Sequence, residues 1–239
     1  MPDPVSVSDR LRGMVPTLSV GVLAADLMNL ERDVRLLEQS GAKILHFDIM
    51  DGCFCPMLTA GQQFVKAVKT SLIKDVHLMI QDPLPKLESY VAAGADILTV
   101  HIEGCLHPHR IFQALGQMAG PAGKPVRGVG LNPGTPLSLI EPLLDELEMV
   151  FLLAINPGWG GQKFINSTVR RVETLREMIR KSGRNILIGL DGGITRGNIA
   201  DVAKMGADIV VTGSAVFEGK KVVENAHFMM DAVMSGQKG

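Results

Sequence analysis

The chain has 239 residues, of which 46% are hydrophobic and 21% are charged, and its formal net charge at pH 7 is −1. This balance is typical of a globular protein and gives no indication of binding to nucleic acid or to an anionic membrane surface. The longest apolar stretch lies around Met149–Ile155 and is far too short to span a bilayer.

The first 16 residues are predicted to be an amino-terminal extension that is partly disordered or used in assembly. They include Asp3, Asp9, Arg10 and Arg12 and lack the apolar core of a signal peptide. The chain has three cysteines, and this odd number argues against a disulfide framework. We therefore expect a cytoplasmic protein in which residues 17–239 form a single domain.

Apolar, strand-like runs alternate with amphipathic segments along the chain. The strand-like runs lie near Leu18–Ala24, Ile44–Met50, Val76–Ile80, Ile97–His101, Val126–Asn132, Val150–Asn156, Ile186–Asp191 and Ile209–Gly213. The helix-like segments lie near Leu27–Gln39, Gln62–Thr70, Pro83–Ala93, His107–Ala119, Leu137–Glu146, Ile165–Lys181, Arg196–Met205 and Val222–Met234. Eight strands that are each followed by a helix predict an α/β fold of the closed (β/α)8 barrel type. An open doubly wound sheet is the alternative, although it usually has fewer units in this length.

Three of the predicted strands end in residues that can bind a metal ion. The second strand carries His46 and Asp48, the third carries His77, and the seventh runs into Asp191. Such groups are rare at the ends of core strands because burying them without partners is costly. Two imidazoles and two carboxylates would suit Zn²⁺, Fe²⁺, Mn²⁺ or Co²⁺. The sequence therefore predicts a divalent metal site.

The position of the two carboxylates within the barrel indicates a kind of chemistry. In this fold the carboxyl ends of the strands carry the active site. The second and seventh strands lie on opposing sides of the barrel mouth, so Asp48 and Asp191 should face each other across a bound substrate. Two opposed carboxylates can remove a proton from one face of a carbon and return one to the other, which is the geometry that an epimerase needs.

Glycine-rich segments follow three consecutive predicted strands. They are Gly158-Trp159-Gly160-Gly161 after the sixth, Gly192-Gly193 after the seventh, and Gly213-Ser214 after the eighth. Glycine permits close backbone approach, and phosphate binding after strands 7 and 8 is a recurrent feature of these barrels. These segments therefore predict a phosphate pocket next to the metal site.

Several segments, in order, resemble the signature of the ribulose-phosphate 3-epimerase family. They are His46-Phe47-Asp48-Ile49-Met50-Asp51-Gly52, Val76-His77-Leu78-Met79, Leu131-Asn132-Pro133-Gly134-Thr135-Pro136, Asn156-Pro157-Gly158-Trp159-Gly160-Gly161-Gln162, Leu190-Asp191-Gly192-Gly193 and Gly213-Ser214. The match runs from about Ser19 to Phe217, which is nearly the whole chain.

The resemblance implies a TIM barrel of the ribulose-phosphate binding type that converts D-ribulose 5-phosphate to D-xylulose 5-phosphate through an enediolate. It implies one divalent metal ion per subunit (Zn, Fe(II), Mn or Co), held by His46, Asp48, His77 and Asp191. Asp48 and Asp191 would also be the paired acid and base. His77, Met50, Met79 and the glycine-rich segments would contact the sugar phosphate, and the protein would form a homo-oligomer.

Three departures from the family pattern concern the substrate wall. Val20-Gly21 stands where the family usually has Pro-Ser, Met57 stands in place of Asn, and Leu153-Ala154 stands in place of Met-Thr. The metal and acid/base residues are retained. This combination fits the same chemistry on a related ketose phosphate, such as allulose 6-phosphate or a tetrulose phosphate, as an alternative substrate.

Two other functions are less favoured. A Schiff-base aldolase needs a lysine at the carboxyl end of a strand, whereas Lys43 and Lys74 open their strands. The Asp-x-Lys-x-x-Asp pattern of related decarboxylases is absent from the third strand. A non-catalytic sugar-phosphate binder would not need the acid/base pair.

His101 and Glu103 are interpreted as core residues with satisfied hydrogen bonds rather than as ligands.

Overall fold

The computed structural model describes residues 6–236. Eight parallel strands form a closed barrel, in which each strand pairs with the next one along the chain and β8 pairs with β1. The strands are β1 Thr17–Gly21, β2 Ile44–Met50, β3 Ile73–Met79, β4 Ile97–His101, β5 Val126–Leu131, β6 Met149–Leu153, β7 Leu187–Asp191 and β8 Ile209–Thr212. The prediction of a TIM (β/α)8 barrel is confirmed, and the open sheet is excluded.

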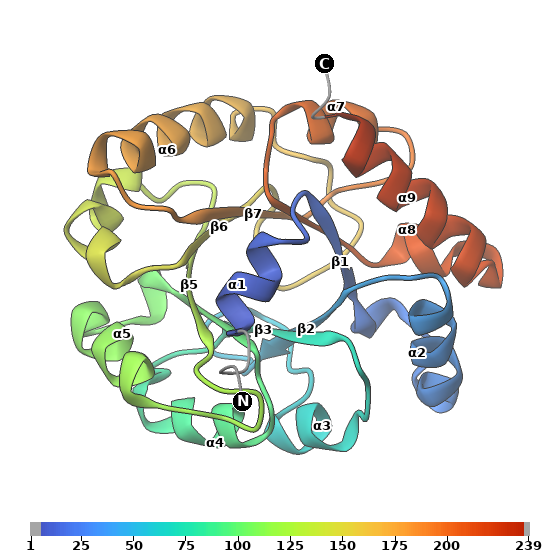
Figure 1. The fold of residues 1–239 in the computed structure, drawn as a ribbon, viewed down its shortest axis with the longest axis horizontal. Helices are drawn as coiled ribbons and strands as arrows, with labels where there is room; N and C mark the ends of the chain where they lie inside the picture. The colour runs from blue at the N-terminus through green and yellow to red at the C-terminus, as the bar shows by residue number, and fades with distance from the viewer. Residues whose placement is uncertain (1–5, 237–239) are drawn as a thin grey trace, which may run out of the picture.

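Helices surround the barrel as an outer ring (Figure 1). The α-helices are α1 Val7–Arg12, α2 Leu30–Gln39, α3 Gln62–Ala67, α4 Leu87–Ala92, α5 Pro108–Gln117, α6 Thr168–Ser182, α7 Ile199–Lys204, α8 Ser214–Phe217 and α9 Val222–Gly236. The 3-10 helices are η1 Val22–Ala24, η2 Leu27–Asn29, η3 Leu84–Lys86, η4 Ile102–Gly104, η5 Leu137–Glu146 and η6 Glu218–Lys220.

The predicted elements differ from the observed ones mainly at their ends. Strand β3 begins at Ile73, three residues before the predicted start at Val76. The predicted helix over Leu137–Glu146 is the 3-10 helix η5, which contains Pro142. Proline has no N–H to donate and clashes with the preceding turn of an α-helix, so a tighter and less regular helix forms there.

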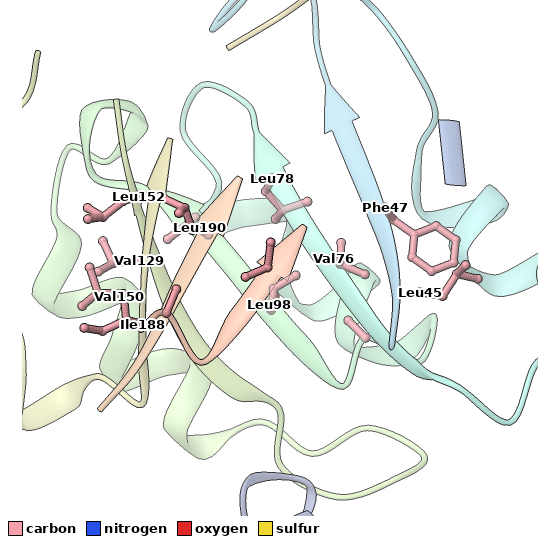
Figure 2. Packing of buried hydrophobic residues seen from close by; sticks show 14 of the residues in the cluster. Leu45, Phe47, Val76, Leu78, Leu98, Val129, Val150, Leu152, Ile188 and Leu190 are labelled. Carbon is pink, nitrogen blue, oxygen red and sulfur yellow. The ribbon is translucent and has the colours of Figure 1, made fainter. Parts of the chain in front are cut away.

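Side chains that alternate along the strands separate into two layers. Leu45, Phe47 and Ile49 of β2 face outward and join the large apolar cluster between the barrel and the helices. Figure 2 shows this layer, in which Leu45, Phe47, Val76 and Leu78 lie on neighbouring strands. Ile44 of β2 belongs instead to a second apolar cluster inside the barrel. Because alternate residues of a strand face opposite sides, His46 and Asp48 share the interior face with Ile44.

Helix α1 closes the amino-terminal end of the barrel, and in Figure 1 it lies across the barrel centre. Val7 and Leu11 are buried and belong to the interior cluster, which also contains Ile44 and Ile73 at the starts of β2 and β3. The extension is therefore packed against the barrel at residues 7 and 11. The division between residues 1–16 and residues 17–239 stays a prediction, and residues 1–5 lie outside the described part of the chain.

Leu11→Ala is expected to lower the free energy of unfolding by about 2–5 kcal/mol, because the buried leucine would leave a cavity at the barrel floor. Urea denaturation would measure the loss. Arg10→Ala is the matched control, since Arg10 lies on the exposed side of the same helix. Equal stability of the two variants would show that α1 is not part of the folded core.

No helix within residues 6–236 is both long enough and apolar enough to cross a membrane.

Candidate active site

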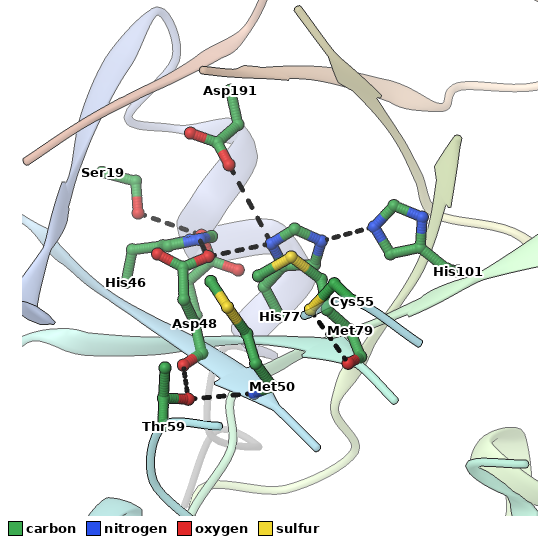
Figure 3. A network of polar contacts seen from close by, with 11 residues as sticks. Ser19, His46, Asp48, Met50, Cys55, Thr59, His77, Met79, His101 and Asp191 are labelled. Atoms are coloured by element: carbon green, nitrogen blue, oxygen red, sulfur yellow. Dashed lines mark hydrogen bonds and ion pairs between the residues drawn. The ribbon is translucent and has the colours of Figure 1, made fainter. Parts of the chain in front are cut away.

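The register of β2 and β3 brings four polar side chains together inside the barrel. His46 lies opposite Asp75, and Asp48 lies opposite His77. All four residues therefore face the interior on two adjacent strands. Asp191 is the last residue of β7 and reaches the same space from another part of the barrel wall (Figure 3).

The four predicted metal ligands form one compact group. Their ligand atoms all lie within 4.8 Å of one another. Asp48 Oδ1 is 3.1 Å from His46 Nε2 and 3.1 Å from His77 Nδ1, and Asp191 Oδ2 is 4.0 Å from His77 Nδ1. The two imidazoles are fully buried, whereas the side chains of Asp48 and Asp191 are 21% and 18% exposed. The carboxylates are therefore the members of the group that a substrate can reach.

His46 is held by residues that the sequence analysis did not identify. Its Nδ1 lies 2.7 Å from Asp75 Oδ2, and the same carboxylate oxygen accepts a hydrogen bond of 3.0 Å from Ser19 Oγ. The ring of Phe151 stacks on the His46 imidazole, with their centroids 5.7 Å apart. The signal that could have revealed Asp75 is its spacing of two from His77, which places both on one face of β3.

His77 is oriented by a second imidazole. Its Nε2 lies 2.8 Å from Nε2 of the buried His101, and His101 Nδ1 lies 3.0 Å from Glu103 Oε2. His101 therefore has both ring nitrogens paired, as a core residue should. That one of these partners is the proposed metal ligand His77 was not predicted from the sequence.

The pKa values of the two carboxyl groups of the site are shifted in opposite directions. Burial and the nearby charge of Asp48 raise the pKa of Asp191 to about 7. Burial acts in the same direction on Asp48, but the charge and hydrogen bonds of His46 and His77 outweigh it and hold the pKa of Asp48 far below its ordinary value. One carboxylate is thus ready to accept a proton and the other is able to carry one, which is the division of roles that acid/base pairs use.

The pKa values of the three histidines His46, His77 and His101 are also shifted in different directions. Burial lowers the pKa of His46, but the charges of Asp75 and Asp48 outweigh burial and raise it well above its ordinary value. Burial lowers the pKa of His77, and it lowers the pKa of His101 to about 4. His77 and His101 are therefore neutral at neutral pH, and a neutral imidazole is the form that binds a metal.

The four residues fit a divalent transition-metal ion. Metal–nitrogen and metal–oxygen bonds of about 2.0–2.2 Å place two ligand atoms of one ion at most about 4.4 Å apart. The observed limit of 4.8 Å is close to this spacing, so small side-chain shifts would complete the site. The far nitrogen of each histidine already has a partner, as is usual for metal-binding imidazoles.

Binding of Zn²⁺ is expected to release about one proton per subunit at neutral pH, because a histidine must lose its proton to bind a metal. His46, whose pKa is raised well above its ordinary value, supplies this proton. Asp191 can bind through one carboxylate oxygen while the other keeps the proton that the reaction needs, so it releases none. Isothermal titration calorimetry in buffers of different ionisation enthalpy would count the protons, and a release of two would contradict a protonated Asp191 in the metal-bound protein.

A cavity of about 510 Å³ opens beside Asp191. Its lining includes the predicted phosphate-binding residues Gly160, Gly161, Gly192, Gly193, Gly213 and Ser214. Gly192 has a φ of +104°, and a Cβ there would come within 2.3 Å of Ile155 Cγ1, so only glycine fits at this wall. Lys163, which the sequence analysis did not single out, also lines the cavity and brings a positive charge to it.

The other predicted substrate-contact residues lie around this centre. Met50 and Met79 are buried at the ends of β2 and β3 and form a small cluster with Cys55 (Figure 3). Gly158 and Trp159 are not among the residues that line the cavity. Gly158 packs closely against Cys55 and Pro56, and Trp159 is 47% exposed.

Comparison with known proteins agrees with the family resemblance seen in the sequence motifs. Residues 17–217 match the sequence model of the ribulose-phosphate 3 epimerase family. The chain is 41% identical to ribulose-phosphate 3-epimerase of Bacillus subtilis over 199 residues, covering 82% of this chain and 89% of the relative. It is 38% identical to ribulose-phosphate 3-epimerase of Aquifex aeolicus over 220 residues, covering 91% and 97%.

Among solved structures, 3-hexulose-6-phosphate synthase from Salmonella typhimurium shares the barrel fold, with a TM-score of 0.67 and 19% identity, covering 92% of this chain and 99% of that one. At this identity the likeness concerns the fold alone. The sequence match spans every strand of the barrel and includes the four residues of the compact polar group. The chain belongs to the ribulose-phosphate 3-epimerase family.

Proposed function

We propose that this protein is a metal-dependent ketose-phosphate 3-epimerase that interconverts D-ribulose 5-phosphate and D-xylulose 5-phosphate. The observation that carries the proposal is the placement of Asp48 and Asp191 on β2 and β7, with ligand atoms in one group no more than 4.8 Å across. Two carboxylates of different acidity in one small site are what inversion at a carbon next to a ketone requires.

In the forward direction the ionised Asp48 takes the proton from C3 of the bound ketose, which leaves an enediolate. Asp191, in its protonated form, delivers a proton to the opposite face of C3. The two residues then exchange roles for the reverse reaction. A bound divalent cation, held by His46, Asp48, His77 and Asp191, would stabilise the negative charge that develops on the substrate oxygens.

The substrate phosphate is proposed to lie in the cavity beside Asp191. Backbone groups of Gly192, Gly193 and Gly213 line this space, and Lys163 adds a positive charge that favours a dianion. Met50 and Met79 are proposed to form the apolar wall beside the reacting carbon, and they exclude water from it. Trp159 is proposed to contact the substrate from its exposed position in the loop after β6.

A panel of ketose phosphates tests the substrate. Among these ketose phosphates, D-ribulose 5-phosphate should exchange its C3 proton with solvent with the largest kcat/KM. The departures at Gly21, Met57, Leu153 and Ala154 favour allulose 6-phosphate or a tetrulose phosphate as the second candidate. If one of these has a much larger kcat/KM than D-ribulose 5-phosphate, it is the substrate, and the proposed epimerisation chemistry is unchanged.

An aldolase that works through a Schiff base is disfavoured by the position of its candidate lysine. Lys74 lies near the amino-terminal end of β3, and its Nζ donates to the carbonyl of Val65 at 2.7 Å. Borohydride treatment with substrate should therefore trap no adduct. A non-catalytic binder would show the same binding but no exchange of the C3 proton.

We further propose that the protein is cytoplasmic, holds one ion of Zn, Fe(II), Mn or Co per subunit and forms a homo-oligomer. The donor set of two imidazoles and two carboxylates supports this choice of metals. Metal analysis and light scattering of the purified protein would test the metal content and the subunit number.

A further inference from the structure

A chain of three side chains leads away from the metal group. His77 Nδ1 faces Asp48 and Asp191, and its Nε2 lies 2.8 Å from His101 Nε2. On the far side of His101, Nδ1 lies 3.0 Å from Glu103 Oε2. The chain is partly shown in Figure 3, where His77 lies between Asp191 and His101.

We infer that Glu103 is a positioning residue, which acts through His101 to hold the proton of His77 on Nε2 while Nδ1 binds the metal. This inference rests on the proposed metal-dependent function. Glu103 is not a member of the metal group, and the proposed proton transfers do not use its hydrogen bond to His101.

The positions of the protons follow from the contacts. A neutral imidazole carries one N–H, and two facing imidazole nitrogens need one donor and one acceptor. If His77 Nε2 donates, its Nδ1 is free for the metal, His101 Nε2 accepts, and His101 Nδ1–H donates to Glu103. In the opposite arrangement the proton of His77 sits on Nδ1, where it can donate to Asp48, 3.1 Å away, but blocks the metal. The lone pair of His101 Nδ1 then faces the carboxylate of Glu103, which repels it. Glu103 therefore favours the first arrangement, and a metal ion that takes Asp48 as a ligand removes the competing hydrogen bond.

Glu103 is fixed in the form that selects the first arrangement. Its Oε1 accepts hydrogen bonds from the backbone N–H of Asn132, at 2.7 Å, and from the hydroxyl of Thr135. The N–H of Asn132 can only donate, so an acceptor must face it. The guanidinium of Arg171 donates to the carbonyls of Thr135 and Asn132 and so ties this loop to α6.

The backbone also leaves space for the hydrogen-bonded side chains of His77, His101 and Glu103. A Cβ at Gly130, the neighbour of His101 on β5, would come within 3.1 Å of His101 Nε2. Glycine at this position leaves the imidazole space to lie against His77, with ring centroids 5.0 Å apart. The arrangement is thus built by β3, β4, β5 and the loop after β5.

Glu103→Gln tests the inference because it keeps the shape and reverses the polarity. The amide oxygen must face the N–H of Asn132, so the NH2 group faces His101 Nδ1 and donates to it. His101 then donates from Nε2 to His77, which holds the proton of His77 on Nδ1, where it blocks the metal. Affinity for Zn²⁺ is expected to fall by about 10–100-fold, the usual effect of losing a partner of a metal-binding histidine.

Glu148→Gln is the matched control. Glu148 has similar exposure, 27% against 22% for Glu103, but it pairs with Arg127 near the amino-terminal ends of the strands. Its Zn²⁺ affinity should equal that of the original protein. Circular dichroism and thermal unfolding of both metal-free variants would establish that each is folded.

The deciding measurement is the tautomer of His101 in the Zn²⁺-loaded original protein, read from ¹H–¹⁵N correlations of histidine ring nitrogens. Its proton should be on Nδ1, facing Glu103, whereas in metal-free Glu103→Gln the proton of His77 should be on Nδ1. A proton on Nε2 of His101 in the Zn²⁺-loaded protein, or an unchanged Zn²⁺ affinity in Glu103→Gln, would overturn the inference while leaving the proposed function intact. If the original protein binds Zn²⁺ but does not exchange the C3 proton of any ketose phosphate, the proposed function fails and the role of Glu103 in metal binding stands.

Discussion

Asp191→Asn is expected to lower kcat/KM for epimerisation by about 10³-fold or more, because the asparagine amide can neither deliver nor accept the second proton. Asp191 is the group whose pKa burial and Asp48 raise to about 7, so at neutral pH it carries the proton in part of the molecules. Steady-state assays with D-ribulose 5-phosphate would measure the loss. The fold should be retained, since the asparagine has the same shape.

The remaining activity of this variant would separate the two carboxylates. In deuterium oxide, Asp48 should still exchange the C3 proton of D-ribulose 5-phosphate, with almost no D-xylulose 5-phosphate formed. Because Asp191 is also a proposed metal ligand, the metal content of the variant must be measured together with its rate. Asp201→Asn, at an exposed position on α7, is the control and should keep full activity. Ordinary turnover in Asp191→Asn at full metal occupancy would refute the two-carboxylate scheme.

Removal of the metal is the second change with a large expected effect. A chelator should reduce activity by about 10²–10⁴-fold, since the stabilisation of the enediolate charge is worth several kcal/mol. Zn²⁺, Fe²⁺, Mn²⁺ or Co²⁺ should restore the rate. Ca²⁺ should not, because it prefers six to eight oxygen ligands, whereas His46 and His77 offer nitrogen.

Histidine variants provide controls for this chelation and metal-restoration experiment. His77→Ala removes a ligand that is fully buried and should abolish restoration at metal concentrations that suffice for the original protein. His109→Ala changes a histidine at the start of α5, outside the metal group, and should leave the metal response unchanged. Full activity after exhaustive chelation, with no metal detected by elemental analysis, would remove the metal from the proposed mechanism.

Much of the fold could be read from the sequence because barrel strands have a strong local pattern. Runs such as Met149–Leu153 are apolar on both faces, since one face meets the helices and the other meets the barrel interior. Element ends were less certain. The apolar run Val76–Ile80 begins inside β3 because Lys74 and Asp75 make the start of the strand polar, although Lys74 lies at the strand's outer side and Asp75 pairs with His46 inside.

The metal group could be predicted because its members end predicted strands, and the carboxyl ends of barrel strands converge on one mouth. The partners of its histidines could not be predicted from the sequence. Asp75 was overlooked because it looked like part of a polar strand start. His101 and Glu103 were interpreted as core residues, and their link to His77 was missed because they form no motif with it.

The sequence by itself determined the order of strands and helices, and it identified the residues that converge at the barrel mouth. These properties follow from short-range periodicity and from the position of each polar group along its own strand. Tertiary structure decided which nitrogen of each imidazole faces the metal group and which of the two carboxyl groups is the weaker acid. Both depend on burial and on partners tens of residues away, such as Asp75 for His46 and Asp48 for Asp191, and barrel closure alone brings them into contact.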